Sequence, residues 1–284
     1  MTSLAALERE PRVVAIVSAR MASSRYPGKA LVPLAGRPLL EVLLERVASC
    51  PLLDSVALAT SAREDNLPLC AIAQRMGIPV FRGDEDDVLR RYVDCARHMG
   101  ANHVVRVTGD NPLTDLETME RLIERQLDQG AEYTYVTGDA LLMGILSEVV
   151  SRSALERSWE QGQAHHRSEL VTLYIKEHPG QFRIATAELP PGLYRPQYRL
   201  TVDEAEDVRL MQALFERLAA PGKIVTTREA IALLDAQPEL AQINAHLQHK
   251  SANLRSVQLD DAVTQTTGSS TQRTRRSAEN ATKE

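Results

Sequence analysis

The amino-acid sequence predicts an α/β fold built on a mainly parallel β-sheet that is sandwiched between helices. Short apolar runs alternate with segments whose apolar residues recur at helical spacing, starting near residue 12. The apolar runs are continuous rather than alternating with polar residues, which is typical of strands buried on both faces. With 284 residues, of which 43% are hydrophobic, the chain is long enough for one large domain of this class.

The first strand, loop and helix establish the pattern. Residues 13–17 (VVAIV) form the first predicted strand, and a polar loop follows as far as Lys29. The next helix is marked by apolar residues at helical spacing, namely Leu39, Leu40, Leu43, Leu44 and Val47.

The same unit then repeats three times. We expect strands at residues 55–60, 78–81 and 103–107, and helices at 67–76, from the acidic run 84–87 to Gly100, and from Asp115 to Gln129. Gly77 and Gly100 stand where glycine commonly ends a helix, and Asp115 is a favoured N-cap residue. Strands that alternate with helices in this way predict a Rossmann-like sheet.

The alternation becomes irregular between residues 131 and 200. We expect short strands at 133–136, 182–185 and 197–200, with helices at 153–161 and 168–177. We interpret this stretch as an α+β insertion that shapes the site of a second substrate. Asp203 then begins another helix, and two more follow as far as about His249.

The two ends of the chain differ from this domain in composition. Residues 1–11 alternate small and charged side chains, and we expect a flexible N-terminus there. Ser, Thr, Gln, Asn and Arg dominate from residue 251 onward. Such a segment buries too little apolar surface to offset its ordering entropy, so residues 251–284 are predicted to be a disordered tail.

Composition also excludes several classes of protein. The formal net charge of -5 provides no basic excess for a broad nucleic-acid surface. No apolar stretch approaches the roughly 20 residues that span a bilayer, and the N-terminus lacks the apolar core of a signal peptide. We therefore expect a cytoplasmic protein with no membrane or nucleic-acid partner. Cys50, Cys70 and Cys95 lack metal-ligand spacing and are expected to be buried thiols in helices.

The loop at residues 18–29 (SARMASSRYPGK) carries the main candidates for chemistry. Loops at the carboxyl ends of parallel strands are where such folds bind ligands. Arg20, Arg25 and Lys29 suit phosphate oxygens, and Gly28 permits close backbone approach. The loop matches neither the Gly-x4-Gly-Lys phosphate loop nor the Gly-x-Gly-x-x-Gly dinucleotide motif. The alternative, a solvated basic loop, is disfavoured by three cations in one strand–helix connection.

Two aspartates are candidate metal ligands. Asp110 follows a predicted buried strand, and Asp203 follows the apolar segment before the next predicted helix. Carboxylates at strand ends can hold Mg²⁺, a hard ion that prefers oxygen ligands and bridges to phosphates. For either residue alone, the alternative of helix capping is equally acceptable.

The loop resembles the Ala-Arg-x-x-Ser-x-Arg-x-Pro-Gly-Lys signature of the cytidylyltransferases that make CMP-sugars. This superfamily includes the CMP-KDO and CMP-sialic acid synthetases, and the subgroup most similar to the chain is the spore-coat polysaccharide biosynthesis type. Four further blocks agree in order, at residues 58–61 (LATS), 81–92 (FRG followed by DVLRRY), 106–113 (RVTGDNPL) and 198–203 (YRLTVD). The resemblance spans roughly residues 12 to 215.

This resemblance implies a nucleotidyltransferase domain at residues 12–250 with the fold of the nucleotide-diphospho-sugar transferases. It implies Mg²⁺-dependent transfer of CMP from CTP to a sugar, sugar acid or similar small acceptor, for polysaccharide, glycan or specialised metabolite synthesis. Arg20 and Lys29 would stabilise charge on the α-phosphate and leaving group, and Arg25 would steady the loop or the outer phosphates. The implied nucleotide-binding residues are Ala19, Ser23, Gly28, Thr60, Ser61, Arg82 and Arg91, and the implied metal ligands are Asp110 and Asp203. An alternative for Arg91 is pairing with the acidic run at 84–87. The resemblance further implies a homodimer, to which residues 131–200 would contribute.

The acceptor region departs from the family pattern. Glu148 and Glu169 keep the family's residue type and are the implied acceptor-binding residues. Leu146 replaces an Asp, and Ser168 and Leu170 replace the Arg and His that flank the second Glu. Two alternatives therefore remain: another nucleotide such as GTP or UTP, or a nucleotide-binding homologue without turnover. His165 and His166 with Glu169 lack further ligands, so no zinc site is predicted.

Overall fold

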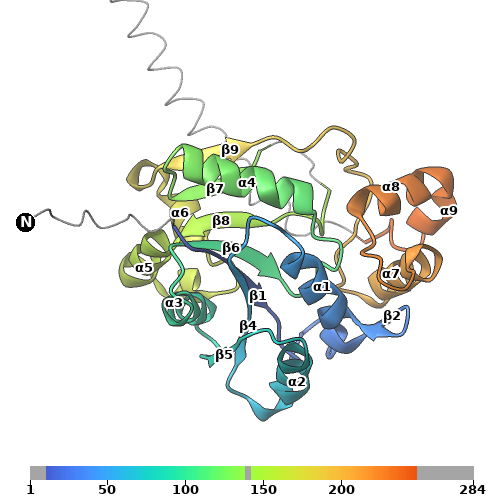
Figure 1. The fold of residues 1–284 in the computed structure, drawn as a ribbon, viewed down its shortest axis with the longest axis horizontal. Helices are drawn as coiled ribbons and strands as arrows, with labels where there is room; N and C mark the ends of the chain where they lie inside the picture. The colour runs from blue at the N-terminus through green and yellow to red at the C-terminus, as the bar shows by residue number, and fades with distance from the viewer. Residues whose placement is uncertain (1–10, 138–141, 248–284) are drawn as a thin grey trace, which may run out of the picture.

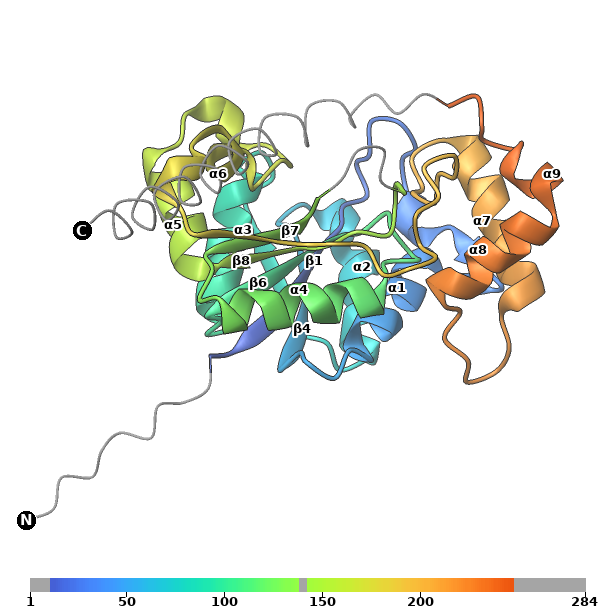
Figure 2. The ribbon, with the colours of Figure 1, turned by 90° about the horizontal axis from the view of Figure 1, so that it is seen from above.

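The computed structural model describes residues 11–137 and 142–247 and confirms a mainly parallel sheet between layers of helices (Figures 1 and 2). Seven strands form this sheet in the order β5-β4-β1-β6-β8-β7-β9. The strand order changes direction beside β1, where open sheets of this kind bind ligands at their carboxyl edge. Residues 1–10 of the predicted flexible N-terminus (1–11) and the whole predicted tail, residues 251–284, lie outside the described residues.

The first half of the chain follows the predicted repeats. Its strands are β1 (Val13–Ser18), β4 (Ser55–Ser61), β5 (Val80–Gly83) and β6 (His103–Thr108), and its helices are α1 (Leu39–Ala48), α2 (Leu67–Arg75), α3 (Val88–His98) and α4 (Leu116–Asp128). Strand β1 pairs in parallel with β4 on one side and β6 on the other. Because both partners are parallel, the carboxyl ends of β1, β4 and β6 lie at one edge of the sheet. Asp87 and Asp115 cap α3 and α4 with their side chains.

The second half completes the same sheet instead of forming an insertion upon it. Strand β8 (Glu148–Ser151) runs antiparallel to β6 and to β7 (Tyr133–Val136), and β9 (Ile184–Ala187) pairs in parallel with β7. The helices of this part are α5 (Arg152–Gln161) and the short α6 (Leu173–Glu177).

Two expectations for this region were wrong, and one strand was missed. Residues 197–200 form no strand, and Arg199 makes only an isolated bridge with Met143. The predicted helix at 168–177 contracts to α6, and β8 was not expected at all. Strands β7 to β9 each span four residues, a length at which the neighbouring strand decides the conformation more than the local sequence does.

Alternate side chains of β1 face opposite layers of the core. Val13, Ala15 and Val17 pack in the cluster that includes residues of α1, α2 and α4. Val14 and Ile16 pack with residues of α3, α5 and α6. Figure 2 shows the two helical layers on opposite sides of the sheet, with α3 and α5 on one side and α4 on the other. Residues 13–17 of strand β1 are all apolar because helices cover both faces of the sheet.

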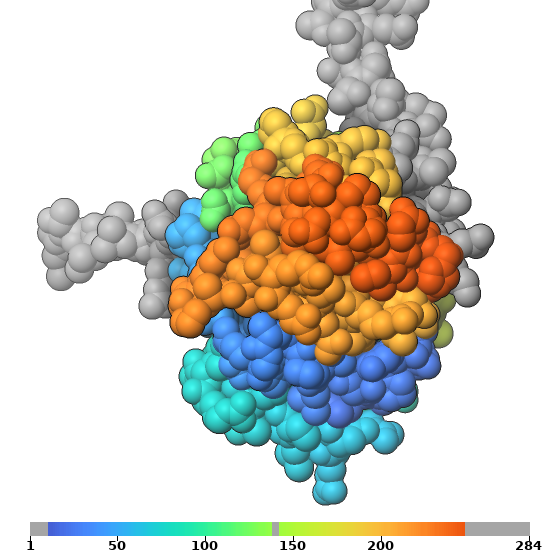
Figure 3. Space-filling view, turned by 90° about the vertical axis from the view of Figure 1, so that its right-hand side faces the viewer, coloured from blue at the N-terminus to red at the C-terminus, as the bar shows by residue number. Residues whose placement is uncertain are grey.

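The C-terminal helices form a third apolar cluster beside the sheet. These helices are α7 (Ala205–Leu218), α8 (Thr227–Ala236) and α9 (Pro238–Ala241). They pack against the small hairpin of β2 (Pro33–Leu34) and β3 (Arg37–Pro38), which the sequence analysis missed. Figure 3 shows the orange and red C-terminal helices lying directly against the blue N-terminal segment. Segments far apart in the sequence therefore meet at this end of the molecule.

Two smaller points concern cysteines and membranes. All three cysteines are buried, with Cys70 in α2 and Cys95 in α3, whereas Cys50 follows α1 rather than lying in a helix. Within the described parts of the chain, no helix has the length and apolar character needed to cross a membrane.

Gly109 permits the closest approach between β6 and the loop after β1. Its backbone N–H donates to the carbonyl of Ser18 over 2.8 Å. A Cβ built on Gly109 would lie 2.6 Å from the Cβ of Ala19 and 2.7 Å from the Ser18 oxygen. These separations are too short for any side chain, so either the loop or Asp110, the next residue, would have to move.

We predict that Gly109→Ala lowers the free energy of unfolding by about 1–3 kcal/mol, the usual range for overpacking a tightly packed position. Urea denaturation followed by circular dichroism would measure this loss. Gly180→Ala is the matched control, because nothing lies within 4 Å of a Cβ at that position. Equal stabilities for the two variants would contradict the steric argument.

Candidate active site

The loop after β1 is held in a defined shape by its own backbone. Gly28 adopts a left-handed conformation with φ of 75°, and its N–H donates to the carbonyl of Met21 over 2.9 Å. This turn places Lys29 at the start of the short 3-10 helix η1 (Lys29–Leu31). The Ser23 hydroxyl accepts a long hydrogen bond from the N–H of Tyr26, at 3.5 Å. Gly28 and Ser23 therefore help to set the shape of the loop, and nucleotide binding by these two residues stays a prediction.

A buried asparagine connects this loop to β4. The side-chain oxygen of Asn66 accepts from the N–H of Met21 over 2.8 Å, and its amide donates to the Ser61 hydroxyl over 2.7 Å. Asn66 and Ser61 are both almost fully buried. Ser61 therefore supports the loop from behind. Sequence reasoning missed Asn66, because its contact with the loop depends on the folded sheet.

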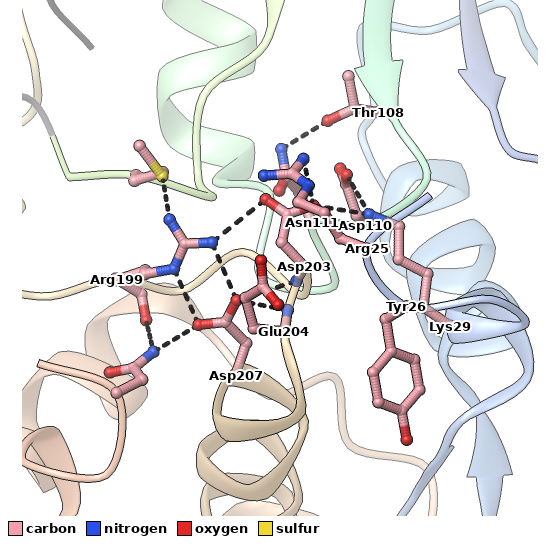
Figure 4. A network of polar contacts seen from close by, with 12 residues as sticks. Arg25, Tyr26, Lys29, Thr108, Asp110, Asn111, Arg199, Asp203, Glu204 and Asp207 are labelled. Atoms are coloured by element: carbon pink, nitrogen blue, oxygen red, sulfur yellow. Dashed lines mark hydrogen bonds and ion pairs between the residues drawn. The ribbon is translucent and has the colours of Figure 1, made fainter. Parts of the chain in front are cut away.

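Lys29 reaches from the loop after β1 toward Asp110 and Asp203, as Figure 4 shows. Its Nζ lies 2.8 Å from Oδ2 of Asp110 and 2.8 Å from Oδ1 of Asp203. Arg25 also contacts Oδ1 of Asp203 over 2.8 Å. Four residues predicted from three separate stretches of the sequence are therefore brought together at the carboxyl end of β6.

Burial and neighbouring charges act in opposite directions on the pKa values of Asp110 and Lys29. Burial disfavours the ionised carboxyl of Asp110, but the adjacent Lys29 ammonium outweighs it and lowers the pKa of Asp110. Burial likewise opposes the charge on Lys29, while Asp110 and Asp203 together raise its pKa. Both partners are consequently charged at neutral pH.

A second layer of contacts fixes Asp203 from the other side. Arg199 donates to Oδ2 of Asp203 over 3.2 Å and makes a two-point pair with Asp207, at 2.8 and 2.9 Å. Asp207 also accepts from the backbone N–H groups of Asp203 and Glu204, at 3.0 Å each. Asn244 donates to both Asp207 and the Arg199 carbonyl. The Asp203 carboxylate is thereby held between Arg199 and the pair Lys29 and Arg25 (Figure 4).

Sequence reasoning missed the residues of this layer. Arg199 stands in the block at 198–203, where its position four residues before Asp203 was a usable signal. Asp207 belongs to the first turn of α7, where an acidic residue reads as an ordinary helix-start preference. Nothing local marks Asn244, which reaches the site from beyond α9.

Arg20 lies between two carboxylates at longer range. Its guanidinium is 3.9 Å from Glu85 and 3.9 Å from Glu169. The Arg20 side chain is 37% exposed and that of Glu169 is 73% exposed. The predicted phosphate-binding and acceptor-binding residues, Arg20 and Glu169, are therefore neighbours.

The residues predicted for base and ribose recognition cluster near the ends of β4 and β5. Thr60 is fully buried, and its hydroxyl has no hydrogen-bond partner in the described parts of the chain. Arg82 is exposed and donates to the carbonyls of Ala62 and Arg63, at 2.6 and 3.1 Å. Ala19, at the end of β1, donates its N–H to the Ala59 carbonyl over 3.4 Å.

Arg91 joins this cluster from α3. It is only 2% exposed, and burial lowers its pKa. Its guanidinium donates to the carbonyl of Asp84 and, over 3.5 Å, to the Ser18 hydroxyl. The contact of Arg91 with the acidic run thus uses a backbone carbonyl, and its other contact reaches Ser18 at the start of the loop after β1.

Glu148 lies in an internal charged cluster. Its carboxylate accepts from the Tyr133 hydroxyl over 2.6 Å and from Lys176 over 2.5 Å, and it pairs with Arg106 over 3.1 Å. Burial disfavours its charge, but Lys176 and Arg106 outweigh that effect and hold the pKa of Glu148 well below its ordinary range. These contacts give Glu148 a structural role, and acceptor binding by this residue stays a prediction.

Two histidines meet a carboxylate, but it is Glu177 and not the expected Glu169. Ligand atoms of His165, His166 and Glu177 lie within 4.8 Å of one another. However, the N–H of Gln163 donates to Nδ1 of His166 over 2.8 Å, so Nε2 carries the proton and donates to Glu177 over 2.7 Å. A metal on Nε2 would require the opposite tautomer, with a proton on Nδ1. The hydrogen bonds therefore account for this group without zinc.

Comparison with known proteins adds to this geometry. A family model described as cytidylyltransferase matches residues 14–264. The spore coat polysaccharide biosynthesis protein SpsF of Bacillus subtilis is 38% identical over 234 residues, which cover 81% of this chain and 96% of that protein. The 3-deoxy-manno-octulosonate cytidylyltransferase of Bdellovibrio bacteriovorus is 24% identical over 261 residues, which cover 82% and 96% of the two chains. The structure of a cytidylyltransferase from Leptospira borgpetersenii superposes with a TM-score of 0.75 at 26% identity, covering 82% of this chain and 97% of that chain.

We predict that Glu148→Gln costs about 2–4 kcal/mol of stability at pH 7, because it leaves the largely buried Arg106 and Lys176 without a countercharge. The folded pKa of Glu148 is lowered, so its contribution is present above the unfolded pKa and is lost as the pH falls below about 5. The stability difference between wild type and variant should therefore narrow in acid. Urea denaturation at pH 7, 5 and 4 would measure it.

Glu206→Gln is the control for this series, because Glu206 pairs with Arg209 at the surface over 2.7 Å. It should change stability by less than about 1 kcal/mol at each pH. A loss for Glu148→Gln that is the same at pH 7 and pH 4 would show that its charge is not the cause.

Proposed function

The chain belongs to the cytidylyltransferase family, within the CMP-sugar synthetase superfamily, and we propose that it transfers CMP from CTP to a small acceptor. The acceptor would be a sugar, a sugar acid or a similar small molecule. The reaction would depend on Mg²⁺ and would release pyrophosphate. The observation that carries this proposal is the meeting of Lys29 and Arg25 with Asp110 and Asp203 at the carboxyl end of β6. That edge of a parallel sheet is where such folds bind nucleotides.

The donor set at this point suits Mg²⁺. One oxygen of Asp110 and one of Asp203 point to the same place, which the Lys29 ammonium occupies at 2.8 Å from each. Asn111, next to Asp110, has a buried side-chain oxygen with no hydrogen-bond partner in the described residues. Mg²⁺ is typically held by one or two carboxylates together with water and substrate phosphates. Asp110 and Asp203 would hold the ion, and when bound it would neutralise charge on the triphosphate.

The loop cations would bind and orient the triphosphate. Lys29 and Arg20 would face the α-phosphate and the leaving pyrophosphate, and Arg25 would face the outer phosphates. An oxygen of the acceptor would attack the α-phosphorus in line, forming one P–O bond as the bond to the β-phosphate breaks. Such a reaction depends on positioning and charge stabilisation more than on covalent catalysis by the protein.

The remaining predicted residues would act around this centre. Ala19, Ser23 and Gly28 would shape the nucleotide-facing side of the loop. We propose that Thr60, Arg82 and Arg91 line the base and ribose site, with Ser61 acting through Asn66, because they cluster at the ends of β4 and β5. Their positions support this assignment.

The acceptor would lie on the side of Arg20 and Glu169. The name of the Bacillus relative favours an acceptor used in surface polysaccharide synthesis. Leu146 and Leu170 stand where the family pattern has polar residues, so the acceptor site is less polar than the pattern suggests. With this function we also propose a homodimer and a cytoplasmic location.

We predict that, of the four nucleoside triphosphates, CTP with Mg²⁺ raises the melting temperature most. A ligand present at 100 times its dissociation constant adds about 2.7 kcal/mol to the free energy of unfolding. A thermal-shift screen of ATP, GTP, CTP and UTP, each with and without Mg²⁺, would measure this. Stabilisation by GTP or UTP but not CTP would transfer the function to that nucleotide, and no response to any of them would reject it.

We predict that Asp110→Asn and Asp203→Asn each reduce pyrophosphate release by about 100-fold or more, because each removes charge that would hold the cation at the reacting phosphates. The assay would use CTP, Mg²⁺ and a panel of sugar acids and sugar phosphates. Asp235→Asn is the control, because this carboxylate pairs with Arg195 at the surface of α8. Wild-type rates in Asp110→Asn would refute the assignment of this carboxylate.

A further inference from the structure

The ammonium of Lys29 lies where the two candidate metal ligands converge. Its Nζ contacts Oδ2 of Asp110 and Oδ1 of Asp203 at equal distances of 2.8 Å. The Lys29 side chain is 13% exposed and that of Asp203 is 8% exposed, so little water reaches between them. A lysine, a compact cation on a flexible stem, therefore stands at the shared point of two carboxylates.

The charges of this cluster already balance. Three carboxylates, Asp110, Asp203 and Asp207, are paired with three cations, Lys29, Arg25 and Arg199. A divalent ion added to this arrangement would meet the Lys29 ammonium at short range and would leave the cluster with excess positive charge. A triphosphate carries several negative charges, so it would compensate the charge of the divalent ion and that of the Lys29 ammonium.

The surroundings determine which group can move. Asp203 is held at its other oxygen by Arg199, which is itself fixed by Asp207. Asp110 is tied to the opposite segment through its backbone, because the N–H of Val202 donates to its carbonyl over 2.9 Å. Arg25 touches Asp203, and its side chain is half exposed. The flexible side chain of Lys29 is therefore the part of the cluster best able to leave the shared point.

We propose, on the basis of the function proposed above, that Lys29 occupies the metal position in the nucleotide-free protein and withdraws when a triphosphate binds. In this arrangement the free protein has low affinity for a divalent cation. The nucleotide draws Lys29 toward its phosphates, and the same step opens Asp110 and Asp203 to the ion. By linkage, the ion strengthens nucleotide binding by the same factor as the nucleotide strengthens ion binding.

The test is a titration of the full-length, nucleotide-free protein with Mn²⁺, a probe that also prefers oxygen ligands, with the free ion measured by electron paramagnetic resonance. We expect Lys29→Met to bind Mn²⁺ at least about tenfold more tightly than wild type, within the usual range of site-to-site coupling. Lys223→Met, which removes the same charge from a surface pair with Glu229, should leave the affinity of wild type unchanged. The double variant Lys29→Met with Asp203→Asn should lose the gain.

Two results would overturn the proposal. Wild type that binds Mn²⁺ as tightly as Lys29→Met would show that Lys29 does not cover the site. Failure of both Lys29→Met and Lys29→Gln to bind more tightly, with each shown to be folded by circular dichroism, would show that the carboxylates gain no affinity when Lys29 is removed. Lys29→Gln is included because its amide can still donate to a carboxylate and so preserve the fold.

The Mn²⁺ titration and the nucleotide screen can fail independently of each other. The titration contains no nucleotide, so it reads the competition between Lys29 and the ion even if CTP is the wrong substrate. A nucleotide screen without any response would reject the function and leave the Mn²⁺ result standing. A tenfold gain in Lys29→Met together with stabilisation by CTP and Mg²⁺ would support both.

Discussion

The double ion pair of Lys29 with Asp110 and Asp203 joins three parts of the chain that are far apart in sequence. Its two contacts span 81 and 174 residues. One partner follows β6 in the sheet, and the other precedes α7 in the C-terminal cluster. The site therefore exists only when the C-terminal helices have packed against the sheet, and the apolar cluster beneath α7 and α8 acts indirectly on the chemistry by holding these partners in register.

Each carboxylate is positioned by a different means. Asp110 owes its place to a close backbone approach, in which Gly109 bonds to the Ser18 carbonyl at a distance that excludes a side chain. Asp203 owes its place to side-chain contacts with Arg199, which is fixed in turn by Asp207. Two independent supports around one flexible lysine are consistent with a site whose carboxylates are rigid and whose ammonium is mobile.

The sequence predicted the sheet and its strands β1, β4, β5 and β6, because continuous apolar runs and helical spacing are local signals. It did not predict β8 or the β2–β3 hairpin, since such short strands are defined by their partners. The same limit applies to the site. Lys29 and Asp203 were identifiable from a motif, whereas Asn66 and Asn244 act through contacts that only the folded chain creates.

The hydrogen bonds of the loop after β1 affect how it would bind phosphate under the proposed function. The N–H groups of Ser23 and Gly28 both donate to the Met21 carbonyl, and the N–H of Met21 donates to Asn66. These amides maintain the shape of the loop, and they are not available to a ligand. Glycine-rich phosphate loops surround their ligand with backbone N–H groups, which are weak, fixed dipoles. Under the proposed function, phosphate binding would therefore rely in part on the long, charged side chains of Arg20, Arg25 and Lys29, and this part of the binding would weaken as the ionic strength of the solution rises.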